Sequence, residues 1–353
     1  MRKSLEHEML KKAGDLSSLY GIRDSVINDG RARGVRVFDL KNGCGLNATI
    51  FADRGLDIPY LSYKGYNIAF LSKSGISSPF SYSYSKDGLD SFLRQFSGGF
   101  LTTCGITYSG APCIEEGKEL ALHGMVSNTI AENVAAQQTY QDDEAILKVT
   151  GSIREARIFA ENMRLNREII MKTESNEIYI NDVVENLGYS EQPLMVLYHV
   201  NFGYPILDSG SRVYFSTKNV EPQTDFAKQG LNMYNVIEEP ENIREEQCYY
   251  HTIQDDPSNS FAMLYNPKLK IAAVVHYDAI QCPILCEWKS MQSGDYALGL
   301  EPTTCGTHGR LGAKNEGVIK YLAPGKSYSY NLRFEFLDEL EQINLYRDHC
   351  KED

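Results

Sequence analysis

One carboxylate, Glu301, lies at the end of a strand-like segment, where it could take part in acid–base chemistry. Residues 296–302 read Tyr-Ala-Leu-Gly-Leu-Glu-Pro, and a period of two places three large apolar side chains on one face. Glu301 shares the other face with Ala297 and Gly299, which are too small to fill the space above them. A buried carboxylate must be paired or neutralised, and Pro302 favours extended backbone at the residue before it. Glu301 is therefore either a general base held against a ligand or a rim glutamate on an edge strand.

Two histidines lie in a similar setting. In residues 196–202, His199 and Asn201 lie opposite an apolar face, and in residues 119–124, His123 follows the small Ala121 at the end of a strand-like run. A histidine in such a place is often a core or solvent-facing residue. Strand-end residues that face one concavity are, however, where binding sites form, so the two histidines and Glu301 together predict a polar cleft.

Three weaker candidates follow. Residues 98–105 carry glycines at both ends of a short polar run that contains Thr103, which predicts either a loop approaching a ligand or a helix C-cap and a tight turn. Arg54 follows a strand and precedes a glycine, so it could donate to hydroxyl groups or pair with a neighbouring aspartate. His308, on a Gly-rich loop after Glu301, could reach the same cleft.

Composition limits the partners and the compartment. The net charge of −12 and the lack of a basic cluster argue against nucleic acid. No run of about 18 apolar residues exists, which argues against a membrane span, and the N-terminus lacks the apolar core of a signal peptide. Eight cysteines without a CxxC pair favour reduced thiols in a cytoplasmic protein.

No histidine or carboxylate cluster has metal-ligand spacing, and phosphate- and dinucleotide-binding motifs are absent, so we expect no metal and no cofactor.

The element pattern predicts a mainly β protein. Helices are expected at 5–12, 87–96 and 338–348, each with apolar side chains along one side. Short β-rich runs cover 35–40, 46–51, 145–153, 165–172, 177–185, 195–202, 212–216, 271–276, 284–289, 296–301 and 328–336. Because no regular βαβ alternation occurs, we predict one domain over 1–353. It would be a large antiparallel sandwich with a short helical N-terminal arm and a C-terminal helix.

Five motifs in order give the chain a family resemblance. They are Asp53-Arg-Gly-Leu-Asp57, Gly98-Gly-Phe-Leu-Thr-Thr-Cys-Gly105, Leu122-His-Gly124, Tyr198-His-Val-Asn-Phe-Gly203 and Gly299-Leu-Glu-Pro302. Together they resemble the galactose mutarotase (aldose 1-epimerase) superfamily, in particular its poorly characterised aldose-1-epimerase-like branch. The resemblance implies a large antiparallel β-supersandwich with a sugar site on the concave face of one sheet.

The resemblance also implies roles. Glu301 matches the catalytic base and His199 the catalytic acid, while His123 and Arg54 match residues that assist proton transfer or contact sugar hydroxyls. The segment around His199 departs from that of the mutarotases proper, and their sugar-gripping aspartate has only Asp225 as a candidate here. Further substrate contacts are predicted for Asn201, Lys289, Thr103 and His308, and Trp288 is either a stacking platform or a core residue.

These residue types suit anomer interconversion. A base takes the proton of the anomeric hydroxyl, an acid protonates the ring oxygen, the ring opens, and the same pair closes it with roles reversed. The alternative is a carbohydrate-binding or sugar-sensing protein without turnover. A lyase or hydrolase ranks last, because hydrolysis usually needs two carboxylates and only Glu301 is well placed. The expected partner is a small-molecule sugar, and a homodimer stays open.

Overall fold

Two large antiparallel sheets form the body of the protein. The computed structural model describes residues 5–82, 88–141, 144–252 and 256–350. Within these residues, the first sheet has 11 strands in the order β1-β2-β3-β4-β8-β16-β23-β22-β19-β18, with β5 paired to β4. Its strands are β1 (Gly21–Val26), β2 (Arg36–Lys41), β3 (Leu46–Phe51), β4 (Asp57–Tyr63), β5 (Tyr66–Asn67), β8 (Leu101–Cys104), β16 (Leu197–Phe202), β18 (Asn219–Pro222), β19 (Gln247–Thr252), β22 (Ile284–Gln292) and β23 (Asp295–Thr303).

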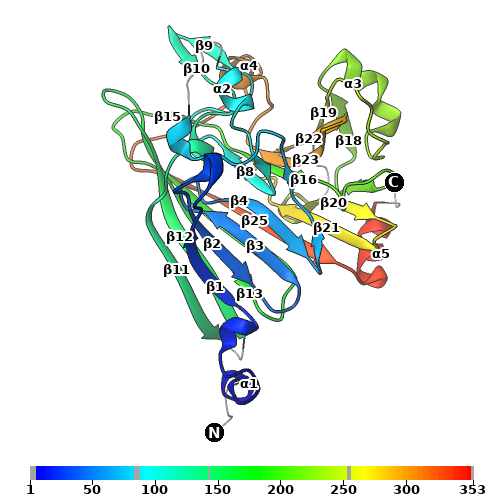
Figure 1. Ribbon diagram of the computed structural model, residues 1–353. Coiled ribbons are helices and arrows are strands. Elements are labelled where there is room, and N and C mark those ends of the chain that lie inside the picture. The colour runs from blue at the N-terminus through cyan, green and yellow to red at the C-terminus, as the bar shows by residue number, and fades with distance from the viewer. Residues whose placement is uncertain (1–4, 83–87, 142–143, 253–255, 351–353) are drawn as a thin grey trace.

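The second sheet lies behind the first (Figure 1) and has 8 strands in the described residues, in the order β11-β12-β13-β14-β25-β21-β20-β17. These strands are β11 (Glu132–Gln141), β12 (Glu144–Ala156), β13 (Asn162–Lys172), β14 (Glu177–Asn186), β17 (Arg212–Phe215), β20 (Ser260–Asn266), β21 (Ile271–Tyr277) and β25 (Ser327–Leu337). Three two-stranded pairs complete the strands: β6 (Phe70–Leu71) with β7 (Gly98–Gly99), β9 (Cys113–Glu115) with β10 (Lys118–Leu120), and β15 (Gln192–Leu194) with β24 (Lys320–Leu322). The predicted mainly β, antiparallel architecture is confirmed.

The core fills the space between the two sheets. On β14, buried and half-buried residues alternate along the whole strand, so that Ile178, Ile180 and Val184 face inward. They join one apolar cluster with inward residues of the first sheet such as Phe38 and Leu298. The outward face of β14 is thereby left mainly for polar side chains, as expected of an antiparallel strand with one solvated face.

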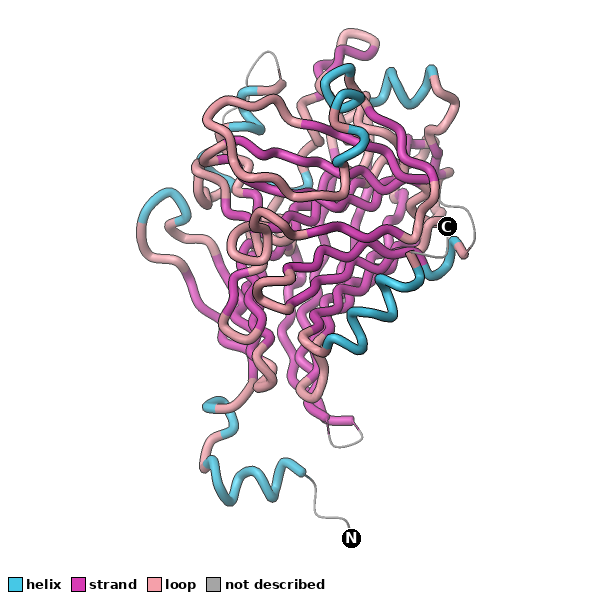
Figure 2. The backbone as a smooth tube through the Cα atoms, turned by 90° about the vertical axis from the view of Figure 1, so that its right-hand side faces the viewer, coloured by secondary structure: helices cyan, strands magenta, loops and turns pink. Residues whose placement is uncertain are grey.

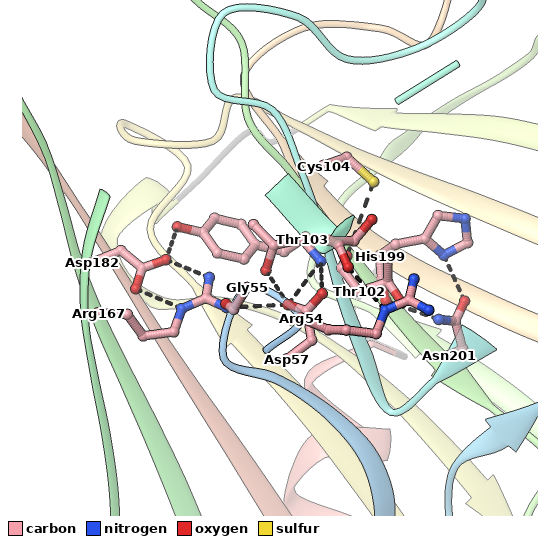
Figure 3. Close-up of polar contacts among 12 residues, drawn as sticks. Arg54, Gly55, Asp57, Thr102, Thr103, Cys104, Arg167, Asp182, His199 and Asn201 are labelled. Carbon is pink, nitrogen blue, oxygen red and sulfur yellow. Dashed lines mark hydrogen bonds and ion pairs between the residues drawn. The ribbon is translucent and has the colours of Figure 1, made fainter. Parts of the chain in front are cut away.

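A buried ionic network crosses this core (Figure 3). The guanidinium of Arg167 donates from Nε and Nη2 to both carboxylate oxygens of Asp182, at 2.9 and 2.7 Å, and from Nη1 to Asp57 at 3.2 Å. Tyr198 donates its hydroxyl to Asp182 at 2.8 Å, and Thr103 donates its hydroxyl to Asp57 at 2.7 Å. Bidentate Arg–carboxylate geometry is specific as well as strong. The network therefore fixes β16 and β8 at the residues next to His199 and Thr102.

The helices are short and peripheral. They are α1 (Leu5–Ala13), α2 (Asp90–Leu93), α3 (Asp225–Gln229), α4 (Gly309–Asn315) and α5 (Leu340–His349). Helix α1 stands away from the body near the N-terminus, whereas α5 runs along one side of it (Figure 2). Ile343 of α5 packs on Phe261 and Met263 of β20, so this helix covers part of the second sheet. No helix in the described ranges has the length and apolar character to cross a membrane.

One predicted helix is wrong in extent. The helix expected at 87–96 is reduced to α2, and Asp87 itself lies outside the described residues. Gly98 and Gly99 form strand β7 instead of a helix stop, and residues 101–104 form strand β8 instead of a loop. Both glycines have positive φ, and a Cβ at Gly99 would lie 2.7 Å from the backbone of Pro59. Close backbone approach, not a helix cap, explains these glycines.

Candidate functional site

A row of side chains crosses the outer face of the first sheet. Because residues opposite each other in antiparallel strands share a face, the register aligns Thr102 with His199, Glu301 with Cys286, and Cys286 with Tyr250. The pairs Leu197–Thr303 and Asn201–Gly299 flank His199 and Glu301 in the same register. The row belongs to five adjacent strands, β8, β16, β23, β22 and β19. The period-two pattern read from the sequence thus placed His199, Asn201 and Glu301 on the correct face.

His199 and Glu301 meet in this row. Nδ1 of His199 lies 3.0 Å from Oε1 of Glu301 and 2.5 Å from Oδ1 of Asn201. The Asn201 amide nitrogen donates to the carbonyl oxygens of Gly99 and His199, at 3.1 and 2.9 Å, so its oxygen must face the imidazole. Nδ1 therefore carries the proton, and no other described residue hydrogen-bonds Nε2. Asn201 orients the ring and leaves Nε2 for another partner (Figure 3).

The carboxylate of Glu301 occupies the space that small neighbours leave. A Cβ on Gly299 would collide with Oε1 of Glu301, so only glycine lets the side chain fold back over its own strand. Oε1 is buried and makes no hydrogen bond of good geometry, although it lies close to His199. A buried acceptor without a hydrogen bond is costly and is typical of a site that awaits a ligand.

Burial sets the protonation of these groups. Desolvation raises the pKa of Glu301 well above its usual range, with Glu246 adding to the effect. Desolvation lowers the pKa of His199 to about 3, with His123 adding to the effect, and lowers the pKa of His123 to about 4. At neutral pH, both imidazoles are then neutral, and Glu301 keeps its proton to a higher pH than an exposed glutamate does. A further proton can therefore be held at two separate positions in this pair, the carboxylate of Glu301 and Nε2 of His199.

Aromatic rings cover the pair. Phe96 and Trp288 lie 5.0 and 5.4 Å from the His199 ring, measured between ring centroids, and His123 lies 5.6 Å from it. Phe92 lies 5.0 Å from His123. His199 is only 6% exposed and Glu301 only 2%. A ligand that approaches from the side of these rings must displace Phe96 and Trp288.

Above the rings lies a groove of about 750 Å³. Trp288, Phe96 and Phe70 line its apolar part, and its lining also includes Arg31 and Glu246. Nε1 of Trp288 donates to Glu246 at 2.7 Å, which fixes the indole at the edge of the groove. The groove is within the size range of small-molecule sites, with apolar walls and a few polar groups.

Two predicted contacts lie on the wrong face. Thr103 is opposite Tyr198 in the register, so its side chain faces the space between the sheets and its N–H and hydroxyl both donate to Asp57. Lys289 likewise faces inward, next to Trp288, and its Nζ contacts the carbonyl of Met233 at 2.9 Å. Neither side chain can contact a ligand at the His199–Glu301 pair, which corrects both expectations.

The side chains of Arg54 and His308 have partners within the protein. Arg54 is buried and donates to the carbonyl oxygens of Ser77, Gln95 and Ser127, which ties three loops to the β3–β4 turn. Burial lowers its pKa to about 10. His308 is exposed and its Nδ1 lies 2.9 Å from Glu316. Arg54 therefore supports the segment that carries Phe96, a structural role in place of the predicted sugar contact.

His308 and Asp225 are at the margin of the row. The His308 ring lies 5.8 Å from that of Tyr250, the end of the row, so it borders the site without contacting the pair. Asp225 is an exposed residue in the first turn of α3. Nothing in its contacts connects it with His199 or Glu301.

Sequence reasoning missed several residues of the site. Phe92 and Phe96 were assigned to the apolar side of the helix expected at 87–96. Thr102 was noted only as part of the 98–105 motif, and Tyr250 and Cys286 were given no role in the site. The pairing of strands that are distant in sequence brings these residues together, and no local motif indicates that pairing. A signal for Phe96 did exist, since it lies just before the Gly98–Gly99 pair that the resemblance already included.

The comparisons with known proteins agree with this architecture. A protein from Klebsiella pneumoniae, provisionally assigned as an aldose 1-epimerase, matches with a TM-score of 0.89 at 23% identity, over 94% of this chain and 87% of that one. A galactose mutarotase-like protein from Clostridium acetobutylicum matches with a TM-score of 0.65 at 16% identity, over 91% and 100%. Galactose 1-epimerase from Lactobacillus acidophilus matches with a TM-score of 0.58 at 12% identity, over 90% and 99%. At these identities the likeness defines the fold, which is galactose mutarotase-like, as the sequence motifs predicted.

The family itself is defined by sequence. Residues 32–336 match the family described as a domain of unknown function, DUF4432, and the chain belongs to that family. No curated protein matches the sequence.

Proposed function

We propose that this protein is a cofactor-independent isomerase that interconverts the anomers of an aldose or a related sugar. One observation carries the proposal: His199 and Glu301, which are distant in sequence, face each other at 3.0 Å below a groove on the outer face of the sheet. A carboxyl that accepts one proton and an imidazole that donates another are the two groups that acid–base ring opening requires.

The proton inventory fits this chemistry. Glu301 as the base accepts the proton of the anomeric hydroxyl, and His199 as the acid delivers a proton through Nε2 to the ring oxygen. A protonated Glu301 beside a neutral His199 has the same number of protons as a Glu301 carboxylate beside a His199 imidazolium. Desolvation disfavours the charged forms of both Glu301 and His199. A bound sugar would offer its hydroxyl groups as hydrogen-bond partners and would therefore favour the carboxylate and the imidazolium. Ring closure on the other face of the aldehyde returns a proton from Glu301 to the new anomeric hydroxyl and a proton from the ring hydroxyl to His199, which completes the cycle.

Asn201 has a positioning role in this scheme. Its hydrogen bond holds the Nδ1–H tautomer of His199 and so points Nε2 at the ligand. Trp288 and Phe96 would exclude water from the reacting sugar once it lies beneath them.

Saturation-transfer NMR tests the proposal. Separate panels of aldoses, uronic acids and sugar phosphates are each supplied with micromolar protein, and magnetisation transfer between the two anomeric protons is measured. Faster exchange of at least one sugar than in buffer is the expected result. Anomeric exchange that stays at the buffer rate for every sugar contradicts the proposal.

A carbohydrate-binding protein without turnover is the second candidate. The low exposure of His199 and Glu301 favours it, because a catalytic pair must be reached at every turnover. Saturable binding of a sugar without faster exchange would be its signature.

A further inference from the structure

Two further hollows follow the groove above the His199–Glu301 pair along the molecule. A second hollow of about 440 Å³ shares Phe70 with it, and a third of about 630 Å³ shares Tyr60 and Asn67 with the second. We call these three hollows the track. It begins at Trp288 and Phe96, passes over Phe70, and ends on the outer face of strands β1 to β4, the blue strands at the front of Figure 1.

Exposed apolar side chains line the middle of the track. Tyr204 is 70% exposed, Tyr60 44% and Leu71 41%. The side chain of Asn67 donates to the carbonyl oxygens of Tyr204 and Ala69, both at 2.8 Å, so it fixes the loop that carries Tyr204. Rings held at the surface in this way offer flat apolar faces with a polar edge, which suits the C–H faces and hydroxyl groups of sugars.

The far end of the track is a polar ladder. In the register of β1 to β4, Arg23 lies opposite Asp39, Asp39 opposite Thr49, and Thr49 opposite Tyr60. A second row holds Lys41, Asn47 and Ser62. Inward residues of the same strands pack in the core, so these side chains project outward.

The ladder offers donors and acceptors side by side. The side chain of Arg23 has no hydrogen bond or ion pair with any described residue, and the hydroxyl of Thr49 donates to Asp39 at 2.7 Å. A solvated sheet face could carry the same residue types. Two features go beyond that explanation: the face is hollowed, and the second hollow, which shares lining residues with both, lies between it and the groove above the pair. Mixed hydrogen-bonding groups favour a neutral chain of hydroxyls over an anion.

We propose that the track binds the body of an oligosaccharide whose reducing-end sugar lies at His199 and Glu301. The assignment of the reducing end rests on the proposed function, because only that end has an anomeric hydroxyl. The binding of the chain by Tyr204, Tyr60 and the ladder does not depend on catalysis. The substrate class is thus a reducing oligosaccharide in place of a monosaccharide.

Length series of oligosaccharides test this inference. The probes are reducing chains of one to five sugars, in separate β-1,4-linked series of glucose, mannose, xylose and galactose and an α-1,4-linked series of glucose. Calorimetry should show an affinity that rises at least about tenfold from one sugar to four in one series, the scale of one or two ring contacts. The same series after borohydride reduction, which removes the anomeric centre, should keep most of that gain.

Variants locate the binding. In the double variant Tyr60→Ala/Tyr204→Ala, the gain with length should disappear while binding of the single sugar is unchanged. Tyr189→Ala is the matched control, because Tyr189 is 100% exposed and lies outside the lining of the three hollows. No gain with length in any series, or a gain that the double variant leaves intact, overturns the inference. A gain with length in a protein that shows no anomeric exchange supports the track and instead refutes the proposed isomerase.

Discussion

The first sheet carries a His–Glu pair on each of its two faces, and the two pairs differ in what surrounds them. His251 and Glu287 lie on the inner face, with Nε2 and Oε2 at 3.0 Å, and His199 and Glu301 lie on the outer face at the same separation. Nδ1 of His251 contacts the hydroxyl of Thr217 at 3.2 Å, and Phe215 stacks on the ring at 3.9 Å. Both nitrogens of His251 therefore have partners inside the protein.

The outer pair differs because one nitrogen of its histidine has no hydrogen-bond partner among the described residues. Asn201 occupies only Nδ1 of His199, and a groove lies on the far side of the rings that cover it. Proximity of a histidine and a glutamate is therefore no sign of catalysis by itself. What separates the two pairs is a nitrogen left available and a hollow through which a ligand can approach.

Among the variants of the outer pair, His199→Asn is expected to have the largest effect on the rate of anomeric exchange. The variant removes the acid, and anomeric exchange should fall at least about a hundredfold, the usual scale for a positioned acid–base group. The double variant His199→Asn/Glu301→Gln should lose little more, because residues that act as a unit are non-additive. Saturation-transfer NMR on the best sugar of the panel measures both. Losses that multiply would mean that the two residues act independently.

A smaller effect is expected for Asn201→Asp, which places a carboxylate beside Nδ1 of His199. An opposite charge at this distance stabilises the imidazolium and typically raises a histidine pKa by about 1–3. The pair then takes up a second proton at higher pH, so the acidic limb of the exchange–pH profile should move upward by at least roughly one pH unit. Asn201→Ala is the control, since it removes the hydrogen bond without adding charge and should not move the limb upward. An unchanged profile in the Asp variant would exclude His199 as the titrating group.

The smallest effect is on stability. The folded-state pKa of Glu301 is raised, so its contribution to stability is complete below its ordinary value of 4.5 and is lost as pH rises above it. Glu301→Gln lacks this loss, and its melting temperature should exceed that of the wild type by roughly 2–4 °C near neutral pH, with little difference near pH 4.

The His199 pKa is lowered to about 3 from 6.5, so the wild type loses stability as pH falls below 6.5. The melting temperature of His199→Asn should therefore exceed that of the wild type most at acidic pH. Circular dichroism melts from pH 4 to 8 measure both trends; a Gln variant no more stable than the wild type at pH 8 would refute the raised pKa.

The strand periodicity made the centre of the site predictable. His199 and Glu301 each lie opposite an apolar face in their own segments, and that local pattern was enough to assign their side. Thr103 and Lys289 were wrong because each lies one residue from a correct one, and in a strand one residue reverses the face. Their neighbours Thr102 and Trp288 face outward.

Long-range contacts explain what the sequence could not supply. The guanidinium of Arg54 is occupied by carbonyl oxygens of loops around residues 77, 95 and 127, and nothing near Arg54 in sequence indicates this. The short helices α3 and α4 likewise lack the periodic length that makes a helix recognisable, so they were not predicted. The single domain over 1–353 and the homodimer stay predictions.

The most direct test of the central claim compares the two pairs in one assay. Anomeric exchange is measured for the wild type, Glu301→Gln and Glu287→Gln, with folding checked by circular dichroism. Glutamine keeps the shape of each side chain and removes its proton acceptor, so the two variants make the same chemical change on opposite faces of one sheet. Exchange should fall at least about a hundredfold in Glu301→Gln and stay near the wild-type rate in Glu287→Gln. Unchanged exchange in Glu301→Gln would contradict the account.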